Sequence, residues 1–149
     1  MNRRHAAIAL IVILAIAAGA LREFLFLNLY YQIDHLAHHR TVSYAHSLFQ
    51  RWTTDLDLRT LGVLKWVFSL AFLLIMLGFA IALARALTGD HRYRRALIAG
   101  YFCVALLALA AYLAGPPWAP VGTKLLHALQ YPVVLFLVWA ASTLRARRT

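Results

Sequence analysis

Residues 61–95, LGVLKWVFSLAFLLIMLGFAIALARALTGDHRYRR, decide the fold of this chain. The first part of this stretch, 61–87, is almost wholly apolar and contains neither proline nor an acidic residue. A helix needs about 20 consecutive apolar residues to cross a hydrocarbon core, so this run predicts a membrane span. Gly89 and residues 90–92 follow it and predict a tight, basic hairpin.

Three further apolar runs of similar character lie at 6–27, 96–114 and 125–144. The chain is 63% hydrophobic and 13% charged, whereas a soluble domain carries about 25% charged residues. We therefore expect an all-α integral membrane four-helix bundle, built as a single membrane domain over residues 1–149. A long amphipathic extracytoplasmic segment, 28–60, is expected to separate the first two spans.

Basic residues gather on one side of this predicted membrane domain. The two termini and the loop around residues 85–95 hold nine arginines against one acid, Asp90, whereas the 28–60 segment has three charges of each sign. Short cytoplasmic loops carry an excess of Lys and Arg, so both termini are expected to be cytoplasmic, in the inner (plasma) membrane of a bacterium. The net charge of +10 is thus interpreted as a topology signal, with the lipid bilayer and no nucleic acid as partner. The nine arginines are Arg3, Arg4, Arg85, Arg92, Arg94, Arg95, Arg145, Arg147 and Arg148.

The N-terminus is similar to a secretory signal peptide, with an Ala-x-Ala pattern at Ala18 and Ala20. Apolar residues resume after Glu23, however, so one helix can continue past this pattern. We expect the first span to be retained. Cleavage would leave three spans in the same orientation.

Local patterns predict how the segments between the spans fold. Helical spacing continues beyond residue 27 to about His38, and a second short helix is expected around 43–52. Thr54 or Asp55 is expected to cap the helix that becomes the second span. In the fourth span, Pro132 removes a backbone donor and is expected to kink the helix.

Four of the seven histidines lie close together in the extracytoplasmic segment: His35, His38, His39 and His46. His35 and His39 are four residues apart, which places them on one face of a helix. Imidazole nitrogens bind transition metals, so this cluster predicts a metal site. The alternative is an interfacial segment whose histidines bind nothing. His127, near one end of the fourth span, is the candidate ligand for a haem.

Four polar residues are expected at membrane depth: Arg22, Glu23, Lys65 and Gln130. Ionisable groups in a span are costly unless they are paired, and they mark functional sites by default. The alternative is that Arg22 and Lys65 extend to the headgroups while Glu23 pairs with one of them.

The sequence contains no recognisable catalytic pattern. Cys103 is the one cysteine, which excludes an intrachain disulfide, and there is no glycine-rich phosphate loop. We therefore expect an accessory or assembly subunit of a larger membrane protein complex rather than an enzyme. Small residues of the third span would let other subunits approach closely. The residues expected to face partners are Tyr30, Tyr31, Asp34, Gly100 and Ala111.

Two other functions stay open at this point. One is electron transfer by a transition metal, haem or quinone bound at the extracytoplasmic histidines. The other is a small membrane enzyme acting on a lipid or isoprenoid, which would need Asp34, Asp55 or Asp57 to converge with histidines.

Overall fold

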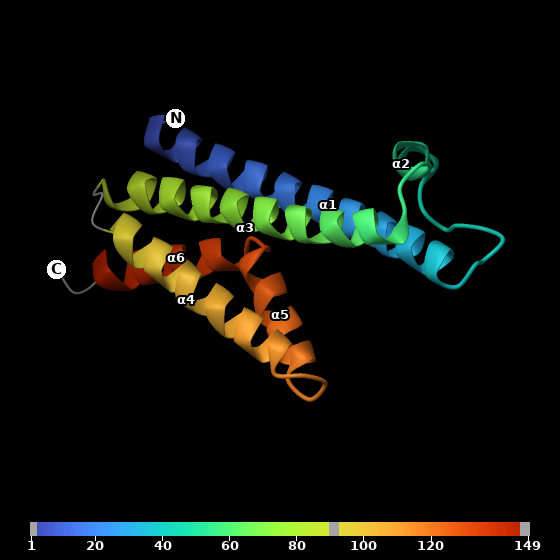
Figure 1. Cartoon of the computed structure of the whole chain (residues 1–149). Helices are drawn as coiled ribbons and strands as arrows, with labels where there is room; N and C mark the ends of the chain where they lie inside the picture. The colour runs from blue at the N-terminus through green and yellow to red at the C-terminus, as the bar shows by residue number, and fades with distance from the viewer. Residues whose placement is uncertain (1–2, 90–92, 147–149) are drawn as a thin grey trace. The chain divides into compact units, whose positions relative to one another are not determined.

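The structure, a computed structural model, describes residues 3–89 and 93–146. These residues form six helices and no strand, which confirms the predicted all-α class (Figure 1). Part of the predicted hairpin, residues 90–92, lies outside the described residues, as do Arg147 and Arg148. The helices are α1 (Arg3–Ala37), α2 (Ser47–Thr53), α3 (Leu58–Thr88), α4 (Tyr93–Leu113), α5 (Ala119–Leu129) and α6 (Val133–Ala146).

Three of the described helices, α1, α3 and α4, are long and apolar enough to cross a membrane. They correspond to the first three predicted spans and indicate a membrane protein. The expected extension of the first helix is also confirmed, because α1 continues to Ala37. Helix α2 corresponds to the short helix expected around residues 43–52.

The fourth predicted span, 125–144, is divided between two helices. α5 ends at Leu129, α6 begins at Val133, and the two helices are bent by 64° at this break. The missing N–H of Pro132 interrupts the helical hydrogen bonds here. The Pro132 ring packs close to α1, because a Cβ added to Gly19 would lie 3.3 Å from its Cδ atom. The expected kink is therefore a complete break in the helix.

Contacts along the chain define two compact units, and the boundary between them falls inside α1 and inside α3. One unit is Ala20–Phe72, which we call the 20–72 unit. The other combines Met1–Gly19 with Leu73–Thr149, and we call it the terminal unit.

In the 20–72 unit, α2 lies beside the end of α1 and the start of α3 (Figure 1). Phe49 of α2 is buried together with Leu29 of α1, Leu61 of α3 and the neighbouring Ala45. Fully burying a leucine or phenylalanine side chain contributes about 1.5–3 kcal/mol. This cluster therefore anchors α2 on the two longer helices.

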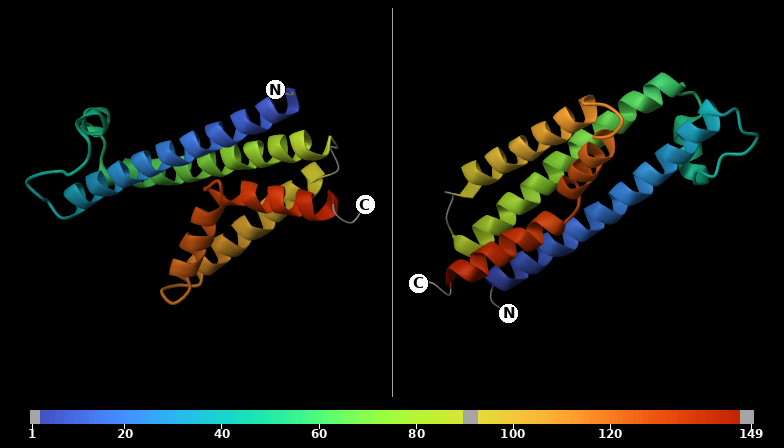
Figure 2. Two further views of the ribbon diagram at one scale, coloured as in Figure 1. Left: turned by 180° about the vertical axis from the view of Figure 1, so that it is seen from behind. Right: turned by 90° about the horizontal axis from the view of Figure 1, so that it is seen from below.

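In the terminal unit, α5 turns back along α4 (Figure 2). Gly122 permits this packing, because a Cβ there would lie 2.4 Å from the Ala108 carbonyl oxygen and 2.8 Å from the Tyr112 nitrogen. It would also lie 3.3 Å from the Cβ of Ala111. Small residues on both helices thus allow the two backbones to approach closely.

The end of α3 is capped by a side chain from α1, also within the terminal unit. Arg4 Nε donates to the Ala86 carbonyl at 2.8 Å, and Arg4 Nη2 donates to the Leu87 carbonyl. The last carbonyls of a helix have no partner within it, and a cation is favoured at the negative end of the helix dipole. Gly89 then adopts a φ of 70° just beyond the helix.

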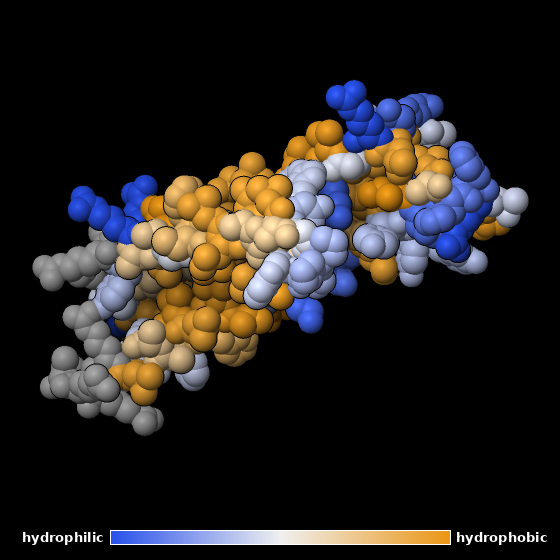
Figure 3. Space-filling view, turned by 60° about the horizontal axis from the view of Figure 1, so that its bottom comes forward, coloured by the Kyte–Doolittle hydropathy of each residue, from blue (hydrophilic) through white to orange (hydrophobic). Residues whose placement is uncertain are grey.

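Large apolar side chains cover much of the surface seen in Figure 3. On α4, Phe102 is 63% exposed, Leu107 62% and Leu113 73%. Apolar exposure on this scale is unusual in soluble monomers and is what a lipid-facing helix presents.

The close packing of α4 and α5 generates a stability prediction. Gly122→Ala is expected to destabilise the protein by about 1–3 kcal/mol, because the new Cβ meets backbone atoms that cannot turn aside. Melting temperature in detergent measures this. Gly100→Ala is the control: no atom lies within 4 Å of its added Cβ, so it should raise stability by about 0.5–1 kcal/mol. Equal melting temperatures for the two variants would contradict the prediction.

Candidate functional site

The candidate site is the segment between α1 and α3, residues 38–57, which we call the cap segment. Half of the predicted site residues lie on it or on the last turns of α1, in the 20–72 unit: Tyr30, Tyr31, Asp34, His35, His38, His39 and His46.

Two buried amides of α1 hold the cap segment. Asn28 and Gln32 are one helical turn apart and only 5% and 7% exposed. The side-chain oxygen of Asn28 accepts from the His46 N–H, and its amide donates to the Phe24 carbonyl at 2.7 Å. The Ser43 hydroxyl donates to the side-chain oxygen of Gln32 at 2.9 Å. These bonds tie both ends of residues 43–46 to α1.

Gln50, on α2, fixes the residues of the cap segment that precede this helix. Its amide donates to the Ser43 carbonyl at 3.1 Å and to the Ala45 carbonyl. The adjacent Phe49 is 2% exposed and anchors α2 in the apolar cluster. Polar bonds and one buried aromatic side chain therefore fix the conformation of the segment.

The motifs of the sequence do not predict a holding role for these residues. The signal that could have indicated it is a pair of amides four residues apart on one face of a helix, because a buried amide requires hydrogen-bond partners. Asn28 and Gln32 form such a pair, and their partners come from the cap segment.

Two of the clustered histidines complete helix ends. His46 is the N-cap of α2, and its Nδ1 accepts from the Leu48 N–H at 3.3 Å. His39 has a φ of 48°, a left-handed conformation in which histidine is enriched. The Arg40 N–H donates to the His35 carbonyl at 3.1 Å across this residue, which closes the end of α1.

The other two histidines lie in different surroundings. His38 Nδ1 is 3.0 Å from Asp34 Oδ1, and Arg40 Nε is 3.0 Å from Asp34 Oδ2. His35 is half-buried, and no described residue forms a hydrogen bond with its Nδ1. Within residues 3–89 and 93–146, no three His, Cys, Asp or Glu side chains are grouped closely enough to hold a metal ion. The metal site stays a prediction that this geometry does not support.

His127 lies on α5 of the terminal unit and is exposed. A haem ligand in a helical bundle is expected to face the interior. The exposed His127 side chain does not face the interior in this way. Its backbone carbonyl accepts from the Gln130 N–H at 2.9 Å.

Arg22 and Glu23 are brought together, and Arg22 is buried. The Arg22 side chain is 2% exposed within the chain, and it lies beside Glu23, one of the two pairings that the alternative interpretation allows. Its Nη1 lies 3.4 Å from Glu23 Oε2, and the guanidinium carbon is 4.7 Å from the centre of the Phe26 ring. A carboxylate and an aromatic face both favour a buried cation.

Lys65 and Gln130, the other two polar residues predicted at membrane depth, belong to different units. Lys65 is exposed, and its Nζ lies 6.0 Å from the centre of the Tyr30 ring. Gln130 is fully buried and is the C-cap of α5, in the terminal unit.

Several aromatic side chains near the cap segment point outward. Tyr30 is 66% exposed, and Tyr44 and Trp52 are each 70% exposed. The ring of Tyr31 packs edge-on against that of Tyr44, with their centres 6.1 Å apart. We call Tyr30, Tyr31, Tyr44 and Trp52 the exposed aromatics; Tyr44 and Trp52 are additions to the residues predicted to face a partner.

Gly100 and Ala111, the two small residues of the third span predicted to face a partner, differ in their surroundings. Gly100 is exposed and has open space around it, with no atom within 4 Å of an added Cβ. Ala111 contacts α5 at Gly122. Gly100 is therefore accessible to another helix, whereas Ala111 already lies beside α5 of the same chain.

The cap of α3 is Asp57, so the prediction of Thr54 or Asp55 is wrong. The Thr60 N–H donates to Asp57 Oδ1 at 2.9 Å. Hydrogen bonds from the Thr60 side chain and backbone hold the pKa of the Asp57 carboxyl below its ordinary value of 3.8. Thr54 instead follows the end of α2, where its hydroxyl donates to the Gln50 carbonyl at 2.8 Å.

Comparisons of the chain with protein-family models, with curated proteins and with solved structures find no match. Its function therefore has to be inferred from the residues and their geometry.

Removing the Asn28 amide tests whether it holds the cap segment. Asn28→Ala is expected to cost about 1–3 kcal/mol, because the His46 N–H loses its acceptor. Trypsin should then cleave faster after Arg40 and Arg51 in detergent-solubilised protein. Leu48→Ala, at a side chain 51% exposed, should leave the cleavage rates unchanged. Equal rates for both variants would show that Asn28 does not hold the segment.

The cap of α3 is expected to weaken in acid. Because the pKa of Asp57 is lowered in the folded chain, its contribution to stability is complete above the unfolded value, about 3.8, and is lost as the pH falls through the lower folded value. Asn also caps helices, so Asp57→Asn should remove this part of the pH dependence. Titration of the ¹³C-labelled Asp57 carboxyl measures the midpoint. A midpoint at or above the ordinary value would refute the hydrogen-bonded cap.

Proposed function

We propose that this chain is a four-span accessory or assembly subunit of a larger membrane protein complex. In this proposal it lies in the inner membrane of a bacterium, with both termini in the cytoplasm and the 28–60 segment outside. The cap segment is its docking element for a partner subunit.

The four-span topology rests on the three long helices and on the pair α5 and α6. Together these two helices pass the length and composition test for one span, although they are bent by 64°. Backbone groups freed at such a break are tolerated where neighbouring helices shield them from lipid. The close approach of Pro132 to Gly19 supports this shielding. The arginines at the connection between α3 and α4 support placing that connection on the cytoplasmic side.

The observation that carries the proposal is a fixed segment that presents aromatic side chains. Asn28, Gln32 and Gln50 fix the backbone of the cap segment, while Tyr44 and Trp52 are each 70% exposed. Tyrosine and tryptophan dominate binding energy at protein interfaces. A segment that is already ordered loses less entropy on binding. This combination favours recognition of a protein partner.

A second contact would be made inside the membrane, at the N-terminal half of α4. Gly100 is exposed with open space around it, which allows the backbone of another helix to approach closely. We leave Ala111 out of this proposed contact, because a Cβ added to Gly122 of α5 would lie 3.3 Å from its own Cβ.

Photo-crosslinking in native membranes tests the proposal. A benzophenone amino acid at Tyr44 or Trp52 is expected to give one discrete crosslinked product, identified by mass spectrometry as a larger membrane protein. Phe136 is the matched control, since it is also an aromatic residue 70% exposed but lies on α6. Lipid adducts alone at all three positions would contradict the docking role.

Co-purification in mild detergent provides the second readout. Gly100→Leu should reduce the yield of co-eluting subunits by about tenfold, as expected for the loss of a close helix contact. Gly78→Leu is its control, because Gly78 is also exposed and has no atom within 4 Å of an added Cβ. A chain that elutes alone would refute the accessory role. A visible haem spectrum or bound metal in that preparation would favour electron transfer instead.

A further inference from the structure

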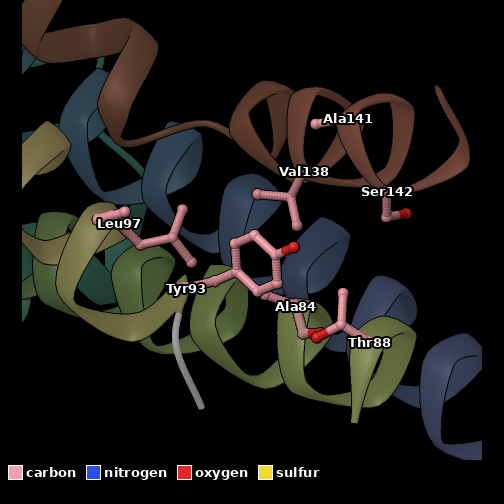
Figure 4. A pocket seen from close by; sticks show the side chains of 8 residues that line it. Ala84, Thr88, Tyr93, Leu97, Val138, Ala141 and Ser142 are labelled. Carbon is pink, nitrogen blue, oxygen red and sulfur yellow. The ribbon is translucent and has the colours of Figure 1, made fainter. Parts of the chain in front are cut away.

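A pocket lies in the terminal unit between the end of α3, the start of α4 and α6 (Figure 4). Its volume is about 270 Å³, close to the lower end of the about 300–1,000 Å³ typical of small-ligand sites. The pocket is lined by Ala84, Thr88, Tyr93, Ala96, Leu97, Val138, Ala141 and Ser142.

The lining changes from apolar to hydroxyl-bearing along the pocket. Figure 4 shows Leu97 toward one end, Thr88 and Ser142 toward the other, and the Tyr93 ring between them. The Ser142 hydroxyl donates to the Trp139 carbonyl at 2.7 Å. Its oxygen can still accept a hydrogen bond from a ligand. The pocket therefore suits a ligand with an apolar chain and a polar head that carries donors.

Two arginines directly follow residues that line the pocket. Arg85 directly follows Ala84 on α3, and Arg94 directly follows Tyr93 on α4; both arginines are exposed. Every carboxylate of the described residues lies between Glu23 and Asp57, in the other unit. An anionic head near these guanidinium groups would meet no carboxylate of the described residues in the same unit, and basic pockets between membrane helices bind lipid headgroups.

We propose that this pocket binds an anionic glycerophospholipid of the phosphatidylglycerol type. One acyl chain enters between Leu97, Ala96 and Val138, and the phosphate lies near Arg85 and Arg94. The glycerol head supplies hydroxyl donors to Ser142. This binding rests on the terminal unit alone and does not require a partner subunit.

Native mass spectrometry of the full chain from detergent tests the site, with phosphatidylglycerol and phosphatidylcholine added in equal amounts. The unmodified chain is expected to retain one phosphatidylglycerol with about thirtyfold preference, as two nearby arginines would give. Ala96→Leu fills the pocket and should reduce retention about tenfold. Ala99→Leu, at an exposed alanine of the same helix outside the pocket, should retain the lipid.

A variant with both Arg85→Gln and Arg94→Gln removes the positive charge but leaves the pocket lining unchanged. It tests the lipid preference even if Ala96→Leu does not fold. It should bind the two lipids equally. Equal retention of both lipids by the unmodified chain would overturn the proposal, as would equal losses in Ala96→Leu and Ala99→Leu. Inorganic phosphate that raises the melting temperature as much as phosphatidylglycerol would also overturn it, because the site would then recognise a free anion.

Discussion

The structure depends on the need of each helix for hydrogen-bond partners at its ends. The first four N–H groups and the last four carbonyls of a helix have no partner within it, and a hydrocarbon environment supplies none. α3 contributes to both compact units and meets this need at both ends. Asp57 accepts from the Thr60 N–H at its start, and Arg4 donates to the Ala86 and Leu87 carbonyls at its end. Each end therefore carries the charge that the helix dipole favours.

The need for partners at helix ends also explains polar residues whose sequence pattern suggests a metal site or a topology signal. His46 caps α2, and His39 takes the left-handed turn that ends α1. Arg4 belongs to the basic cluster interpreted as a topology signal, yet its guanidinium also completes α3. One residue can serve both purposes, because the dipole of a helix favours a cation at its C-terminus whatever other role that cation has.

Sequence patterns predict the long helices well, because each depends on an extended run of apolar residues. They predict helix ends poorly, because an end depends on which of several nearby residues can reach the backbone. Thr54, Asp55 and Asp57 are all competent caps within four positions, and in the structure it is Asp57 that accepts from the Thr60 N–H. The end of a helix also decides how the clustered histidines lie, and the described residues contain no group of three metal-ligand side chains. α1 ends at Ala37, so His39 no longer lies one helical turn above His35.

The cap segment separates the side chains that hold it from those that it presents. Asn28, Gln32 and Phe49 are buried and fix the backbone. Trp52 is exposed and takes no part in those hydrogen bonds, whereas the exposed Tyr44 also packs its ring against Tyr31 of α1. Binding can therefore change through Trp52 at little cost in stability, since surface substitutions usually shift stability by less than about 0.5 kcal/mol. The reverse does not hold. A change among the holding residues would alter both the conformation of the segment and any surface that it presents. Loss of folding in this segment would therefore also impair recognition.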